Sequence, residues 1–233
     1  MKSNKAKVLH EAGGQALVEH VLDAASVAVQ PENTIVVVGH QAEKVQQLLA
    51  PRGCQFVTQT EQRGTGHAVE ICRSIAGLEG LTLILYGDCP LLTPSTISRL
   101  VETQSNGSFA ATLITTVLER PTGYGRIVRA ADGSVAAIVE EKAATDEQKK
   151  IGEINSGIYC IDSALLWKHV GEITPNPASG EIYLTDLVEI LRGAGHSVAA
   201  LLLDDPNEIL GINQRLELAE ADRILRARKT RQL

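Results

Sequence analysis

The sequence predicts an α/β fold built around a largely parallel sheet. In the first half of the chain, short apolar runs rich in β-branched residues alternate with longer segments of helical apolar spacing, the pattern of βαβ units. Aromatic residues make up only 3% of the chain, so Leu, Ile, Val and Ala must form the core, which favours an α/β sheet over a β-sandwich. The 233 residues suffice for one large domain.

The first elements have clear boundaries. Apolar residues that recur every three or four positions predict a helix over 16–29, and the buried run 34–38 predicts a strand that ends at Gly39. A helix over 41–49 and a short strand over 55–58 follow.

A glycine turn opens the next helix, over 66–76, and strand formers occupy 81–86. The sequence Gly87-Asp88-Cys89-Pro90 ends that strand, and the helix over 93–103 carries Pro94 in its first turn, where proline is favoured. Ligands of such sheets bind at the carboxyl ends of the strands, so we expect the site there.

The second half differs, because strands follow one another with little helix between them. It therefore predicts an antiparallel region beside the first sheet, with strands over 109–117, 125–129, 134–139 and 154–161. Helices over 163–170 and 182–192, a strand over 197–203 and a final helix over about 213–228 complete the chain. That helix ends in basic residues, which suit the C-terminal end of a helix dipole and predict a solvated tail.

The charge excludes some classes of function. A formal net charge of -6 and a pI of about 5.6 argue against a non-specific nucleic-acid binder, but a magnesium ion and one or two lysines could still hold a phosphate ligand. The four cysteines form no C-x-x-C pair, which predicts reduced thiols. Without a signal-peptide pattern or a membrane-length apolar run, we expect a cytoplasmic protein that does not span a membrane.

Two turns carry candidate functional residues. Asp88 follows a buried strand, where a carboxylate can hold a hard cation against a ligand phosphate, although a turn or helix-capping role fits equally well. Thr65 lies between two glycines, Gly64 and Gly66, which let backbone N–H groups approach a base or phosphate. A plain αL turn explains these glycines equally well. We expect His67 to be a first-turn helix residue rather than a general base.

A second set of candidates lies in the antiparallel region. Gly125, in the loop 121–126, could let the backbone meet a sugar, although a tight β-connection is favoured from the residues alone. Glu140 and Asn155 lie on or beside adjacent strands and suit hydrogen bonds to sugar hydroxyls or an amide, or they are solvent-exposed. No motif of a catalytic nucleophile is present, so any chemistry would rest on positioning and charge neutralisation.

Together, these segments resemble the uridylyltransferase domain of the bacterial bifunctional N-acetylglucosamine-1-phosphate uridylyltransferase/glucosamine-1-phosphate acetyltransferase family. The matching segments span nearly the whole chain and are residues 7–10, 59–62, 64–68, 86–88, 121–127, 138–140, 153–158 and 211–213. The resemblance implies a Rossmann-like nucleotidyltransferase fold with a three-layer mixed sheet. It also implies a nucleotidyltransferase domain over 1–212 and a C-terminal helix over 213–233.

The resemblance implies a magnesium-dependent reaction in which UTP and N-acetylglucosamine 1-phosphate give UDP-N-acetylglucosamine, a peptidoglycan precursor, and pyrophosphate. Lys7 and Asp88 would be catalytic, with Lys7 neutralising phosphate charge and Asp88 and Asn213 holding Mg²⁺, with Asn213 also touching substrate. The other substrate contacts would be Gln59, Gly64 and Thr65 at uracil, Tyr86 and Gly87 along the nucleotide sugar, and Gly125, Glu140 and Asn155 at N-acetylglucosamine.

The sequence departs from this family at both ends. The family's first strand and its phosphate-binding loop L-A-A-G-x-G-T-R-M would precede Met1, and Lys5-Ala6 replaces the Leu-Pro that usually leads into Lys7. The family's β-helix domain would follow the last helix, so we expect no acetyltransferase activity and no inherited trimer, and the oligomeric state stays open.

The absent strand would lie between the strands 34–38 and 81–86. A vacant slot would leave backbone groups unpaired at about 1–3 kcal/mol each. Three alternatives would avoid this cost: those two strands close together, residues 1–7 fill the gap, or another chain fills it. The favoured hypothesis is a fourth, that the natural protein starts further upstream.

Two alternative functions stay open. The chain could be a non-catalytic remnant that binds a nucleotide sugar or serves as an interaction module, or a pyrophosphorylase for another sugar 1-phosphate.

Overall fold

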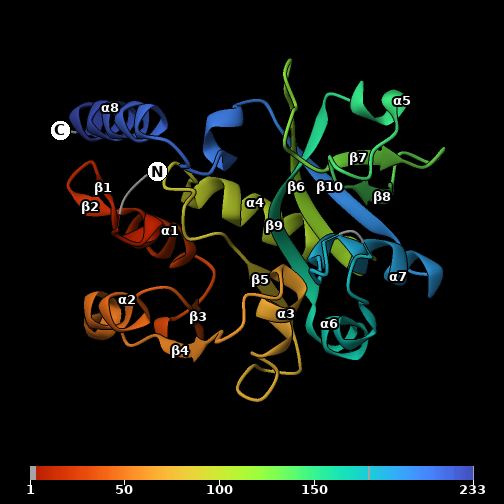
Figure 1. Cartoon of the computed structure of the whole chain (residues 1–233), viewed down its shortest axis with the longest axis horizontal. Coiled ribbons are helices and arrows are strands. Elements are labelled where there is room, and N and C mark those ends of the chain that lie inside the picture. Colours follow the sequence, from red (N-terminus) through yellow and green to blue (C-terminus); the bar gives the residue numbers. More distant parts are fainter. Residues whose placement is uncertain (1–3, 178, 233) are drawn as a thin grey trace. The chain divides into compact units, whose positions relative to one another are not determined.

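The computed structural model describes residues 4–177 and 179–232, in two compact units (Figure 1). Unit 1 consists of Met1–Thr58, Leu85–Ser98 and Asn207–Leu233, and unit 2 consists of Gln59–Ile84 and Arg99–Pro206. Each unit therefore combines segments that are distant in the sequence.

Unit 1 holds short strands and the helices that pack on them. The parallel pair β3 (Ile35–Val38) and β4 (Gln55–Thr58) is in register from Ile35 opposite Gln55 to Val38 opposite Thr58. A small antiparallel pair, β1 (Glu11–Ala12) and β2 (Gln15–Ala16), precedes the first helix. The helices are η1 (Lys7–Leu9), α1 (Leu17–Ala25), η2 (Pro31–Asn33), α2 (Ala42–Leu49), η3 (Ala50–Arg52), the start of α4 (Pro94–Asn106), most of η6 (Pro206–Ile209) and α8 (Arg215–Gln232).

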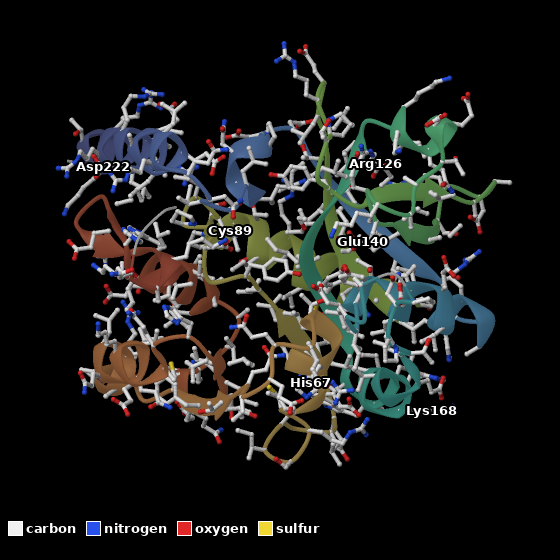
Figure 2. The ribbon with its side chains drawn as sticks, in the orientation of Figure 1. His67, Cys89, Arg126, Glu140, Lys168 and Asp222 are labelled. Atoms are coloured by element: carbon white, nitrogen blue, oxygen red, sulfur yellow. The ribbon has the colours of Figure 1, made fainter. Side chains whose placement is uncertain are left out.

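The last helix, α8, is part of the core of unit 1. Its Ala221 is buried in one apolar cluster with Leu17 and Ile212, and Asp222 (Figure 2) accepts a hydrogen bond of 2.8 Å from the N–H of Gly13 in the β1–β2 turn. Arg228 donates to the carbonyl oxygen of Leu91 over 2.7 Å, so this basic residue is a structural contact rather than part of a solvated tail.

Unit 2 is built on a six-stranded mixed sheet, described within its own residues. The strands are β5 (Leu81–Ile84), β6 (Ala111–Val117), β7 (Arg126–Arg129), β8 (Val135–Val139), β9 (Glu153–Asp162) and β10 (Val198–Leu203). The order is β10-β6-β9-β7-β8, and β5 also pairs with β9. Only the pairing of β10 with β6 is parallel, so the expected antiparallel region is confirmed.

The helices of unit 2 pack on this sheet. α6 (Ser163–His169) contacts β5 and β9, and α7 (Leu187–Gly193) contacts β8 and β10. The remaining helices are α3 (Thr65–Glu70), α5 (Asp146–Lys149), η4 (Val170–Glu172) and η5 (Leu184–Asp186).

Two strands expected to flank a vacant slot, β3 and β5, belong to different units, so closure of one strand on the other stays one alternative among those given above. β3 pairs with β4 in parallel register, and β5 pairs with β9 in antiparallel register. The antiparallel ladder that β9 offers satisfies one edge of β5. Of residues 1–7, the other segment considered for this slot, residues 1–3 lie outside the described residues, 4–6 form no strand, and Lys7 begins the 3₁₀ turn η1. A strand from another chain or from an upstream segment stays a prediction.

Element boundaries differ from the sequence pattern at several ends. α1 stops at Ala25, α3 stops at Glu70, and α4 continues to Asn106. The segment 182–192 is not one helix, because it begins with the 3₁₀ turn η5. The domain boundary expected at residue 212 stays a prediction. Within 4–177 and 179–232, no helix combines the length and apolar character that a membrane crossing requires.

The fully buried Leu17 provides a test of the core of unit 1. We expect Leu17→Ala to lower the free energy of unfolding by about 2–5 kcal/mol, because it leaves a cavity beneath α8. Leu216→Ala is the matched control, since that leucine is 80% exposed and its loss should cost no more than about 0.5 kcal/mol. Urea denaturation monitored by circular dichroism measures both values, and equal losses would contradict this account of the core.

Candidate active site

In unit 1, the structure brings Lys7, Asp88 and Asn213 together. The Lys7 Nζ atom forms an ion pair with Asp88 Oδ2 and donates to Asn213 Oδ1 over 2.8 Å. The backbone supports this contact, because the N–H of Ile212 donates to the carbonyl oxygen of Asp88 over 3.0 Å. A Cβ atom on Gly211 would lie only 3.1 Å from Asp88 Oδ2, so the backbone approaches the carboxylate closely. The Lys7 ammonium therefore binds two oxygen atoms that come from distant segments of the chain.

Glu217, in the first turn of α8, holds Asn213 in place. Its Oε2 atom accepts from the N–H of Asn213 over 2.5 Å and from the N–H of Gln214 over 2.9 Å, at the helix end where a negative charge is favourable. The sequence analysis missed this residue. A capping-box spacing, with Glu three residues after the helix N-cap at Gln214, is the signal that could have identified it.

The Asp88 and Asn213 oxygens also fit a magnesium ion. Both already face one cation, the Lys7 ammonium, and carboxylate and amide oxygens are the donors that Mg²⁺ accepts. The described residues include no cluster of three or more His, Cys, Asp or Glu side chains suited to a metal. Such a donor set fits an ion that takes its remaining ligands from water and substrate phosphates.

Tyr86 and Gly87 lie just before Asp88. The Tyr86 side chain is 37% exposed. A Cβ atom on Gly87 would lie at ordinary contact distances, 3.4 Å from Val8 Cγ1 and 3.5 Å from Val18 Cγ2, so packing alone does not demand glycine there.

Cys89, beside Asp88, is a buried thiol rather than a nucleophile (Figure 2). Burial raises the pKa of Cys89 far above its ordinary value, and the negative charge of Asp88 adds to this effect. Burial also raises the pKa values of Cys72 and Cys160 to about 11. The four cysteines, all within the described part of the chain, are free thiols, as expected.

In unit 2, the glycine turn at 64–66 is held by the segment 182–184. The Gln59 side chain donates to the carbonyl oxygen of Gly64 over 3.1 Å and lies 3.1 Å from the His67 Nδ1 atom. Thr65 Oγ1 accepts from the N–H of Leu184 over 3.0 Å. The structure therefore places Gln59 beside Gly64, and the role of Gln59, Gly64 and Thr65 at uracil stays a prediction.

Gly64 occupies a conformation that only glycine adopts readily. Its φ of 108° and ψ of 177° lie outside the αL region, so the alternative of a plain αL turn is wrong at this position. A Cβ atom here would lie 2.4 Å from the carbonyl oxygen of Ile182. The glycine therefore permits a close approach of two backbone segments.

The other candidates of unit 2, Gly125, Glu140 and Asn155, also lie together. A Cβ atom on Gly125 would lie 3.6 Å from Glu140 Oε1 and 3.7 Å from Asn155 Cβ, and the N–H of Asn155 donates to the Gly125 carbonyl oxygen over 2.9 Å. Glu140 Oε1 accepts from the Thr185 hydroxyl over 3.1 Å. Glu140 is half-buried rather than exposed (Figure 2).

The surroundings of Glu140 favour its protonated form. Burial raises the pKa of Glu140 most strongly, the Thr185 hydrogen bond opposes this shift, and the charges of Asp186 and Glu181 reinforce it. The neighbouring Glu141 behaves in the opposite way, because its hydrogen bond to Arg126 lowers its pKa. The Arg126 side chain is only 1% exposed, and its Nη2 atom lies 2.6 Å from Glu141 Oε2.

The segment 181–186 is the main feature that the sequence analysis missed. Its Leu184 N–H contacts Thr65, and its Thr185 hydroxyl contacts Glu140, so it links both groups of unit 2. The helix expected over 182–192 gave no indication of the contacts of Leu184 and Thr185, because the regular helix α7 begins only at Leu187. Thr185-Asp186 before an apolar helical run is an N-cap signal that places the helix start later.

Comparison with known proteins now assigns the family. The model of the MobA-like NTP transferase domain matches residues 1–152. The chain belongs to this family. The match includes Lys7 and Asp88 and ends before Asn155 and Asn213.

Relatives and a solved structure agree with that assignment. The NTP transferase chain is 53% identical to the bifunctional protein GlmU of Solibacter usitatus (strain Ellin6076) over 232 residues, covering 99% of this chain and 50% of that protein. It is 46% identical over 229 residues to GlmU of Lactococcus lactis subsp. lactis (strain IL1403), covering 98% and 50%. The chain thus spans about half the length of these relatives.

The structure resembles a putative glucose-1-phosphate thymidylyltransferase from Bacillus anthracis, with a TM-score of 0.71 and 19% identity. The similarity covers 94% of this chain and 86% of the other. The expected nucleotidyltransferase fold is confirmed.

Gly64→Ala tests the close backbone approach in the NTP transferase domain. Gly80→Ala is the matched control, because Gly80 also has a positive φ, of 82°, but has open space around its Cα. We expect Gly64→Ala to lower the free energy of unfolding by at least about 1 kcal/mol more than the control, since it adds a clash to backbone strain. Urea denaturation measures the difference, and equal losses would refute the clash.

Glu140→Gln tests the raised pKa of Glu140. A raised folded-state pKa makes the protein most stable below the ordinary carboxyl value of 4.5 and less stable as pH rises through the folded value. We therefore expect Glu140→Gln to be more stable than the wild type at pH 7, with the gain vanishing below pH 4.5. Melting temperatures across this pH range measure the effect.

Glu141→Gln is the control of opposite sign. Its lowered pKa means that the ionised form stabilises the fold, so this variant should be less stable at pH 7, with the deficit fading as pH falls through the folded value. The same sign of change in both variants would contradict these assignments.

Proposed function

We propose that this domain transfers a uridylyl group from UTP to N-acetylglucosamine 1-phosphate. In this reaction, a phosphate oxygen of the sugar phosphate bonds to the α-phosphorus of UTP. The bond from that phosphorus to the oxygen bridging to the β-phosphate breaks, and pyrophosphate leaves. The observation that carries the proposal is the cluster of Lys7, Asp88 and Asn213, whose charge and oxygen ligands suit phosphate chemistry.

Lys7 would supply positive charge where negative charge develops. Transfer of a nucleotidyl group spreads charge over the α-phosphate oxygens and the departing pyrophosphate, and a preorganised cation lowers that barrier. Because two oxygen ligands already restrain the ammonium, less side-chain freedom is lost when the nucleotide binds.

Asp88 and Asn213 would hold a magnesium ion that accompanies the nucleotide. When bound, this ion would neutralise phosphate charge. With such an ion beside it, the Asp88 carboxylate would no longer be neutralised by Lys7 alone, and the Lys7 ammonium could turn toward the substrate phosphates.

The residues of unit 2 would recognise the two organic groups of the substrates. Uracil offers carbonyl acceptors and an N–H donor, which match the Gln59 amide and the backbone of Gly64 beside Thr65. The backbone at Gly125 lies close to Glu140 and Asn155, whose side chains can bond to sugar hydroxyls and to the N-acetyl group.

Pyrophosphate release by this chain, given UTP, N-acetylglucosamine 1-phosphate and magnesium, tests the proposal. We expect Asp88→Ala to lower kcat at least about 100-fold, a loss typical of removing one key electrostatic group. Asp204→Ala is the control, because that aspartate is exposed and should leave the rate unchanged.

Other nucleotides and sugar phosphates complete this test. Faster release with CTP, dTTP or glucose 1-phosphate would assign a different substrate. Binding of UDP-N-acetylglucosamine without any release would favour the non-catalytic alternative, and a rate unaffected by Asp88→Ala would refute the assigned role of this residue.

A further inference from the structure

Gln41, at the start of α2, has an unusual backbone conformation for its residue type. Its φ of 56° and ψ of 38° are left-handed, a region that Gly and, less often, Asn or Asp adopt. Such strain persists only where surrounding contacts stabilise it. The contacts that Gln41 makes therefore indicate what this conformation is for.

The Gln41 side chain closes on the segment just before Lys7. Its Oε1 atom accepts from the N–H of Ala6 over 2.9 Å, and its Nε2 atom donates to the carbonyl oxygen of Asn4 over 2.5 Å. One amide thus uses both its acceptor and its donor on backbone groups two residues apart. Ala6 is only 7% exposed and packs in one cluster with Val45 and Leu49 of α2.

These contacts anchor Lys7 at its backbone. On the other side, the N–H of Leu9 donates to the Ala6 carbonyl oxygen over 3.0 Å, and the N–H of His10 donates to the Lys7 carbonyl oxygen over 3.1 Å. A lysine side chain has many rotamers, so its Cα position limits where the ammonium can lie. The ammonium lies on Asp88 and Asn213.

We propose that Gln41 is a positioning residue, which clamps Asn4 and Ala6 so that Lys7 reaches Asp88 and Asn213. The kinetic consequence rests on the proposed function, whereas the clamp itself does not. Ala6 has a φ of -55°, a value that proline also adopts, but proline would lack the N–H that Gln41 accepts. In this chain, a hydrogen bond restrains a backbone that a proline ring could also restrain.

Competitive acetylation of the folded protein with acetic anhydride, followed by peptide mass spectrometry, tests the clamp without relying on activity. Lys7 is 39% exposed, so the reagent can reach it, and its nitrogen donates to two oxygens that protect it. We expect Gln41→Gly to raise the acetylation rate of Lys7 relative to Lys44 by about five- to tenfold, the size expected for losing one or two hydrogen bonds.

Glycine is the chosen substitution because it accepts a φ of 56°, so backbone strain is relieved rather than added. Gln47→Gly is the matched control: it changes an exposed glutamine of the same helix, weakens α2 and leaves the clamp intact. Asp88→Asn shows the rate for Lys7 without its ion pair. An unchanged Lys7 rate in Gln41→Gly, or an equal rise in Gln47→Gly, would overturn the proposal.

The kinetic readout is specific to positioning. In Gln41→Gly, we expect kcat for pyrophosphate release to fall about five- to tenfold with little change in KM, because the Lys7 ammonium would act mainly on the negative charge that develops in the transition state. Ala6→Pro added to Gln41→Gly should restore part of both kcat and Lys7 protection, since the ring restrains φ without the clamp.

The two readouts separate the two proposals. If the wild-type chain releases no pyrophosphate, the proposed function fails and the Lys7 acetylation rates still decide the clamp. A fall in kcat with Lys7 protection intact would overturn the positioning role.

Discussion

The shared contact of Lys7 with Asp88 and Asn213 is the interaction around which the candidate site of unit 1 is arranged. The three residues come from an N-terminal 3₁₀ turn, from a turn after β5 and from the segment before α8. A half-exposed ion pair contributes little stability by itself. The ion pair instead fixes where the Lys7 ammonium lies, because the hydrogen bonds around Asp88, Asn213 and Ala6 restrain the backbone on each side.

Unit 2 depends on a different constraint, the close approach of backbone segments at glycine. Gly64 lets the turn after β4 meet Ile182, and at Gly125 a Cβ atom would lie only 3.0 Å from Ile138 Cγ2, beside Glu140 and Asn155. The segment 181–186 then contacts both groups through Leu184 and Thr185. Main-chain geometry and the contacts of this segment thus restrain the candidate side chains of unit 2.

Much of the fold and site could be predicted locally. The strand at 55–58 agrees residue for residue with β4, and Asp88 lies beside Asn213, Gly64 beside Gln59 and Gly125 beside Glu140, while the roles of these residues stay predictions. The misses have physical causes. Helical spacing continues past Ala25 and Glu70, where the chain goes on in hydrogen-bonded turns instead of regular helix, and η5 interrupts the pattern that begins at Ile182.

By itself, the sequence determined the alternation of elements, the antiparallel character of the second half and the residue types available for phosphate chemistry, because these follow from short-range spacing and composition. The tertiary structure alone decided that β5 pairs with β9, that Gln41 adopts a left-handed conformation, and that the Thr185 hydroxyl bonds to Glu140. Strand pairing and strained conformations depend on partners far along the chain, whose contributions a local pattern does not contain.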